Sequence, residues 1–239
     1  MEKVETRDLV MEFIGTFSLV FIGGWSVWAS SIKLGVLYAA LVHGAVLGIM
    51  VYIGAKISGG HYNPAVTLGL LFTGQSDLID TALYIISQLM GSLFAGFSLK
   101  WLRPGKYEKL NLGYPHVIKE VEVTQAFFME FLGTFFLVFS IYASAVHYKS
   151  SPEACAAIIG LTLTFAIVAF GDTTGGAFNP ARTFGPSMAD SHLGNKAWWI
   201  YYVATSAGGI AGAMIFKHVV GYEQADLGGM APVHEKKDD

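Results

Sequence analysis

The sequence predicts an all-α integral membrane protein with six transmembrane helices and two re-entrant half helices, arranged as an inverted repeat. Three observations predict this fold. Of the 239 residues, 53% are hydrophobic and only 14% are charged, whereas about a quarter of the residues of a soluble domain are charged. Several apolar runs reach the roughly 20 residues that cross a bilayer. Two decapeptides, 58–67 (SGGHYNPAVT) and 174–183 (TGGAFNPART), are identical at six of ten positions, 116 residues apart.

The apolar runs place the elements in order. Spans are expected at 8–29, 34–57, 80–102, 124–146, 153–170 and 197–220, and half helices at 63–73 and 179–189. The half helices are too short to cross, because eleven helical residues rise only about 16 Å. The fifth span is expected to end before Gly171 and Asp172. The repeats are therefore 8–102 and 124–220, joined by a polar loop, 103–123, and followed by a polar tail, 221–239, in one domain, 1–239.

Each decapeptide should start one half helix. The starts are the triplets Asn63-Pro64-Ala65 and Asn179-Pro180-Ala181. Asparagine is a good N-cap, and proline fits the first helical position because its missing N–H would have no partner there. Each helix N-terminus then carries partial positive charge. Two such starts in a membrane sequence are typical of broken helices that meet at the bilayer midplane; the alternative is that the asparagines only cap helices.

Further internal matches support the duplication. Residues 12–21 (EFIGTFSLVF) and 130–139 (EFLGTFFLVF) are identical at eight of ten positions. Small residues recur at every fourth position at 87, 91 and 95 and at 204, 208 and 212, a spacing that lets helices approach closely in lipid. Each repeat holds three spans, so the second must enter the membrane from the opposite side. Lys and Arg are divided seven to seven between the two sides, so the charge rule leaves the orientation open.

Composition excludes several classes of function. The net charge of −3 comes with no dense basic cluster, so no nucleic-acid partner is expected. The single Cys155 excludes an intramolecular disulfide, and no Cys/His spacing indicates a metal site. No nucleophile and base converge, so neither an enzyme nor a cofactor is expected.

The paired triplets, Arg182 after the second, and the repeated Glu-Phe openings at Glu12 and Glu130 resemble the aquaporin (major intrinsic protein) family over residues 8–220. The resemblance implies a pore in each subunit of a homotetramer in a lipid bilayer, with both termini cytoplasmic. It implies a passive channel for water and small neutral solutes, with Asn63 and Asn179 each offering an N–H to the permeant. Whether the membrane is plasma, vacuolar or another internal one stays open.

The resemblance also implies a selectivity filter, the narrowest ring of the pore. By the family's pattern it combines four residues: His43, Ile167, Gly176 and Arg182. Strict water channels usually have an aromatic residue and a histidine at the first two positions, so this chain departs from them. The set is similar to that of a group of plant tonoplast-intrinsic aquaporins that pass ammonia, and sometimes urea, with water. We therefore expect water and ammonia to pass while protons and ions are excluded. A packing role for His43 is the alternative.

Several further residues receive expected roles from the resemblance. Backbone carbonyls of Gly59, Gly60, His61, Tyr62, Gly175, Gly176, Ala177 and Phe178 would form an acceptor ladder, unless the glycines only permit a tight turn. The carboxylates Glu12 and Glu130 would accept hydrogen bonds from these irregular segments; a proton relay is the alternative. His116 would lie over the filter and orient Arg182, unless it is an ordinary surface histidine.

Two other functions remain open from the sequence. Inverted repeats and broken helices also suit a secondary transporter, which would need ion-coordinating carboxylates at the midplane. A non-conducting junction or scaffold protein is the third possibility, against which Asn63, Asn179 and Arg182 argue.

Overall fold

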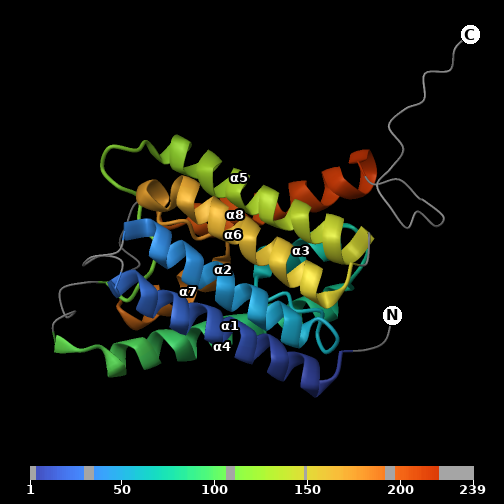
Figure 1. Ribbon diagram of the computed structural model, residues 1–239, viewed down its shortest axis with the longest axis horizontal. Helices are drawn as coiled ribbons and strands as arrows, with labels where there is room; N and C mark the ends of the chain where they lie inside the picture. The colour runs from blue at the N-terminus through green and yellow to red at the C-terminus, as the bar shows by residue number, and fades with distance from the viewer. Residues whose placement is uncertain (1–3, 30–34, 106–110, 148–149, 192–196, 221–239) are drawn as a thin grey trace, which may run out of the picture.

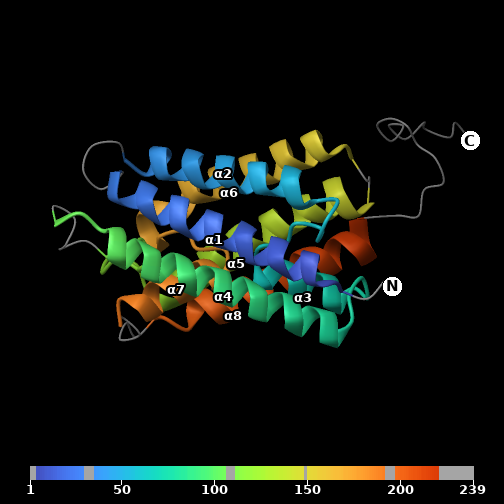
Figure 2. The same ribbon diagram turned by 90° about the horizontal axis from the view of Figure 1, so that it is seen from below.

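The computed structural model describes residues 4–29, 35–105, 111–147, 150–191 and 197–220. Six helices in these ranges are long and apolar enough to cross a membrane. They are α1 (Thr6–Ala29), α2 (Gly35–Gly54), α4 (Leu78–Leu102), α5 (Val123–Ile141) with its π-helical continuation η3 (Tyr142–His147), α6 (Pro152–Thr174), and α8 (Ile200–Ile215) continued by η4 (Phe216–Val220). The two half helices are α3 (Pro64–Phe72) and α7 (Pro180–Ala189). The long helices lie side by side along the molecule, and α1 begins at the end where η4 stops (Figures 1 and 2).

This architecture confirms the predicted fold class, with small errors at helix ends. The fifth span was expected to stop at residue 170, but α6 continues to Thr174 and is ended by Gly175, whose φ is +86°. A left-handed glycine is the usual helix terminator, and Gly171 and Asp172 are accommodated inside the last turns. The second span ends three residues early, at Gly54. Its expected start at Leu34, and the tail 221–239, lie outside the described residues.

Glycines let the long helices cross closely, as the small-residue spacing predicted. A Cβ on Gly91 of α4 would lie 2.4 Å from the carbonyl oxygen of Phe13, and one on Gly208 of α8 would lie 2.2 Å from that of Phe131. These two crossings, α1 with α4 and α5 with α8, build one repeat each.

The two repeats join where α2 crosses α6. A Cβ on Gly44 would lie 2.4 Å from the Gly160 carbonyl oxygen, and a Cβ on Gly160 would lie 2.6 Å from the Gly44 carbonyl oxygen. The contact is reciprocal, and the two glycines are 116 residues apart. A two-fold relation between the repeats therefore holds in space as well as in sequence.

Each half helix packs on the other repeat, α3 on α8 and α7 on α4. At the outer, C-terminal end of each half helix a lysine donates a hydrogen bond to a backbone carbonyl, and the two lysines occupy equivalent positions in the two repeats. The Lys100 ammonium donates to the Ala189 carbonyl over 2.7 Å, and Lys217 donates to the carbonyl of Thr73. A cation at a helix C-terminus is favourable because it complements the helix dipole.

The exposed faces of the long helices carry many large apolar side chains. Large exposed side chains include Leu41, Ile49, Phe94, Phe128 and Phe165, each more than half exposed. Such a surface would be unfavourable in water but suits lipid. The chain is an integral, multi-pass membrane protein.

Candidate functional site

The two Asn-Pro-Ala triplets start the half helices as the sequence predicted. The Asn63 Oδ1 accepts the Ala65 N–H over 2.9 Å, and the Asn179 Oδ1 accepts that of Ala181 over 2.9 Å. The prolines that follow are the first residue of α3 and of α7. Both asparagines are confirmed as N-caps.

The two inner helix ends meet through reciprocal hydrogen bonds. The Asn63 Nδ2 donates to the Phe178 carbonyl over 2.8 Å, and the Asn179 Nδ2 donates to the Tyr62 carbonyl over 2.9 Å. A carboxamide has two N–H donors, so each asparagine keeps a second N–H. Both residues also line a common cavity. The structure thus places two amide groups and two positive helix ends at one point inside the bundle.

Tyr62 and Phe178, whose carbonyls accept the asparagine N–H groups, adopt an unusual backbone conformation. Their φ values are +50° and +48°, and a left-handed non-glycine residue costs about 1–3 kcal/mol. Their rings fit against glycines of the repeated EFxGT sequences: a Cβ on Gly15 would lie 2.0 Å from the Tyr62 ring, and one on Gly133 would lie 2.1 Å from the Phe178 ring. The glycine of each EFxGT sequence therefore leaves room for one of these rings.

This arrangement adds contacts to the expected acceptor ladder. The Tyr62 and Phe178 carbonyls were expected to face the permeant, and each also accepts an asparagine N–H of the opposite segment. A carbonyl oxygen has two lone pairs, so each keeps one acceptor site, and the ladder stays a prediction. These contacts could not be read from the sequence, because donor and acceptor lie 115 and 117 residues apart.

The Glu12 and Glu130 carboxylates are fully buried and hold the irregular segments. Glu12 accepts the N–H groups of His61 and Tyr62 over 2.9 and 2.7 Å. Glu130 accepts those of Ala177 and Phe178 over 3.1 and 2.9 Å. An acceptor-only pattern is that of an ionised carboxylate, and non-helical backbone at this depth needs such partners.

Three pairs of supporting residues were not singled out from the sequence. The Ser58 hydroxyl donates to Glu12 and the Thr174 hydroxyl to Glu130. The Tyr84 and Tyr201 hydroxyls donate to the carbonyls of Ser58 and Thr174. The third pair is asymmetric: the Gln88 amide donates to Glu12, while the Thr205 hydroxyl, 117 residues later, donates to backbone carbonyls of its own helix. Comparing the chain with itself at offsets of 116 and 117 residues would have found the first two pairs.

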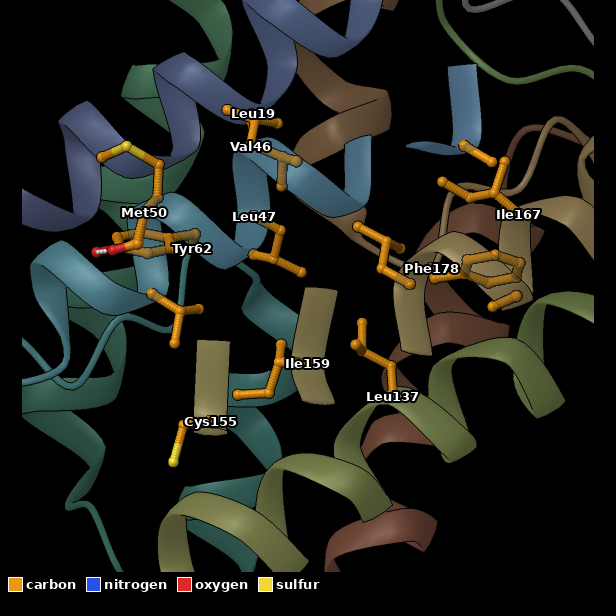
Figure 3. Close-up of a cluster of buried hydrophobic side chains, with 14 of the residues drawn as sticks. Leu19, Val46, Leu47, Met50, Tyr62, Leu137, Cys155, Ile159, Ile167 and Phe178 are labelled. Carbon is orange, nitrogen blue, oxygen red and sulfur yellow. Dashed lines mark hydrogen bonds between the residues drawn. The ribbon is translucent and has the colours of Figure 1, made fainter. Parts of the chain in front are cut away.

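A narrow internal cavity connects the predicted site residues. It is lined by both asparagines and by all four predicted filter residues, His43, Ile167, Gly176 and Arg182. Only about 20 Å³ of it can hold the centre of a water-sized molecule, little more than the 10–15 Å³ or so that one water requires. Apart from His61, its remaining side chains are apolar and come from several helices. Figure 3 shows four of them, Leu19, Leu47, Leu137 and Ile159.

Wider recesses flank this cavity on both sides. One, of about 450 Å³, shares His61 with the cavity and is lined by the first turns of α1 and α4. The other, of about 330 Å³, shares His43, Ile167 and Arg182 with it. The three spaces therefore follow one another through the bundle, and the predicted filter lies where the cavity meets the second recess.

Two polar groups of the predicted filter are buried with unused hydrogen-bonding capacity. Arg182 is 6% exposed, and one of its guanidinium nitrogens has no hydrogen bond among the described residues. His43 is 3% exposed; its Nδ1 contacts the Ala39 carbonyl over 2.8 Å, so Nδ1 carries the proton, and Nε2 has no described partner. Buried polar atoms normally have a protein or water partner, so these two can serve a solvent molecule in the cavity.

His116 lies in the second recess, which Arg182 also lines. The segment that carries it folds onto the end of α6, where Ile118 N–H donates to the Thr173 carbonyl over 3.0 Å. The His116 side chain is exposed. Its pKa is nevertheless lowered, mainly by partial desolvation in the recess and secondly by the positive charge of Arg182.

Comparisons with known proteins agree with this architecture. The model of the major intrinsic protein family matches residues 2–216. The chain belongs to the major intrinsic protein family. Nodulin-26 of Glycine max is 35% identical over 92% of this chain and 80% of its own length, and aquaporin TIP2-1 of Arabidopsis thaliana is 37% identical over 89% and 87%. The chain is accordingly a membrane channel for water and small solutes.

A solved structure supports the fold of this major intrinsic protein. The aquaglyceroporin of Plasmodium falciparum superimposes with a TM-score of 0.81, covering 90% of this chain and 96% of its own. The two sequences are 24% identical, so the likeness concerns the fold alone and not the solute.

Proposed function

We propose that the chain passes water in single file, together with ammonia, and excludes protons and ions. The observation that carries the proposal is the meeting of Asn63 and Asn179 in one narrow cavity that also contains Arg182. Membership of the family does not by itself say which solutes pass. The two amide donors and the positive charge in this cavity favour neutral solutes that accept hydrogen bonds over cations.

Proton exclusion would follow from the paired helix ends. A water between the two asparagines can accept an N–H from each, and its own hydrogens then point away along the cavity. The inner ends of α3 and α7 add positive potential there, and the Arg182 guanidinium adds a full charge nearby. A cation entering this cavity would lose hydration without gaining an anionic partner, which costs several kcal/mol.

Ammonia passage would follow from two filter positions. Ile167 offers neither a hydrogen bond nor a charge, and Gly176 has no side chain, so the ring is less polar and wider than one with histidine at the first of these positions. Aquaporin TIP2-1, which is 37% identical, belongs by name to the group whose filter this set resembles. His43 and Arg182 remain the polar groups for water.

The carboxylates do not favour coupled transport. Glu12 and Glu130 already accept hydrogen bonds from loop amides and hydroxyls, so neither is available as an ion ligand. We propose the family's homotetramer, with a separate pore in each subunit, as the assembly; native mass measurement in mild detergent tests this point.

Stopped-flow measurements on vesicles that contain the purified protein test the solute range. We expect water and ammonia permeability above that of empty vesicles, and no proton current. Ile167→His should suppress ammonia flux by narrowing the ring and adding polarity, while the matched variant Ile167→Leu should leave it unchanged. Ammonia flux that is the same in both variants, or a proton current through the parent protein, would contradict the proposal.

A further inference from the structure

The predicted filter has a counterpart on the other side of the paired asparagines. At the offset of 116 residues, His43 corresponds to Ile159, Ile167 to Val51, Gly176 to Gly60 and Arg182 to Val66. All eight residues line the same internal cavity. The repeat thus builds two rings from equivalent positions, and only one of them has been assigned a role.

The correspondence holds in three dimensions. The reciprocal glycine contact between α2 and α6 and the reciprocal asparagine bonds between the inner ends both follow the two-fold relation of the repeats. Gly60 and Gly176 share a positive φ, +68° and +57°. The second ring therefore lies between the asparagines and the recess lined by the first turns of α1 and α4.

The second ring differs from the first in polarity. Ile159 stands where the first ring has histidine, and Val66 stands where it has arginine. Val51, Ile159 and Val66 are 4%, 3% and 2% exposed, so all three are packed side chains and not surface residues. Figure 3 shows Ile159 among the apolar side chains of this region.

A polar side chain on this side of the asparagines, that of His61, bonds through one of its ring nitrogens to its own segment. His61 lines both the cavity and the adjoining recess. Its Nδ1 lies 3.2 Å from the Thr67 hydroxyl, and its ring packs on Tyr84 with centroids 4.9 Å apart. A molecule leaving the asparagines on this side must therefore pass the apolar side chains before it reaches a polar recess.

We propose that Val51, Gly60, Ile159 and Val66 form a second, apolar ring that sets the ratio of ammonia to water permeability. A water molecule at this ring gives up hydrogen bonds that the side chains cannot replace. Ammonia is hydrated less strongly than water, so the ring slows it less. The inference rests on the proposed ammonia conduction and adds specificity-determining residues that the filter does not include.

Threonine has almost the shape of valine but carries a hydroxyl, so it tests polarity at constant size. Val66→Thr should raise water permeability per channel about two- to tenfold, the factor that one net hydrogen bond supplies, and should raise ammonia permeability less. The ammonia-to-water ratio should fall, and Val51→Thr should change it in the same direction. Val51→Ala, which changes size without polarity, should raise both permeabilities with little change in the ratio.

Val20→Thr is the matched control, because Val20 is 2% exposed in α1 and does not line the cavity. It introduces the same buried hydroxyl and should leave the ratio unchanged. All variants are compared as purified channels in the same vesicles, normalised to the amount of folded protein. If both solutes pass but the ratio is the same in Val66→Thr, Val51→Thr and the parent, or rises in the threonine variants, the second ring has no such role. If no ammonia passes even the parent, the proposed solute range is wrong instead.

Discussion

Replacing Glu130 by alanine removes the acceptor of three hydrogen bonds in the interior. Its oxygens accept the Thr174 hydroxyl over 2.6 Å, the Ala177 N–H over 3.1 Å and the Phe178 N–H over 2.9 Å. Leaving a buried donor without a partner costs about 1–3 kcal/mol, so Glu130→Ala should lose about 3–9 kcal/mol. Whole domains are stable by only about 5–15 kcal/mol, so this variant should accumulate poorly as folded protein.

Glu130→Gln should have an intermediate effect. The glutamine carbonyl can keep the bonds to Thr174 and Ala177, but its NH2 group would face the Phe178 N–H. The Phe178 N–H then has no acceptor, which should lower the stability of the fold by about 1–3 kcal/mol. Because Phe178 lies two residues from Gly176, this variant should also conduct less water per folded channel.

Thermal unfolding in detergent, followed by tryptophan fluorescence, measures the order of stability. Glu120→Gln is the matched control, since Glu120 is exposed in the loop before α5 and surface changes are usually within about 0.5 kcal/mol. The expected order is parent and Glu120→Gln, then Glu130→Gln, then Glu130→Ala. A Glu130→Ala protein that unfolds at the parent's temperature would refute the assignment of this carboxylate as the support of the segment.

Three further outcomes are expected. Burial and Arg182 lower the pKa of His116 in the folded chain, so as the pH falls below about 6.5 His116 takes up a proton in the unfolded chain before it does so in the folded chain. Acidification from pH 7.5 to 5 should therefore reduce thermal stability less in His116→Gln than in the parent. Gly133→Ala should displace the Phe178 ring, whose atoms would lie 2.1 Å from the new methyl carbon, and abolish water flux in vesicles, whereas an alanine that conducts normally would show that the ring has room. Lys100→Met should lower the unfolding temperature and Lys100→Arg should restore it, because a cation at the C-terminal end of α7 is worth about 0.3–1 kcal/mol; equal temperatures for the two would rule out a charge effect.

Local rules explain what the sequence determined by itself. The number of spans follows from the lengths of the apolar runs, and the starts of α3 and α7 follow from an asparagine cap and a proline that act within one helical turn. The inverted topology follows from the offset between the repeats and an odd number of spans in each. None of these conclusions requires knowing which helices touch.

The tertiary structure decided the contacts between distant residues. His43 and Ile167 share a cavity because α2 and α6 cross at glycines 116 residues apart. The Tyr62 and Phe178 carbonyls each accept an asparagine N–H because the two inner helix ends meet. The extension of α6 to Thr174 likewise places its last hydroxyl on Glu130. Such pairings depend on the angle and distance at which helices pack, and the apolar pattern of each helix fixes neither.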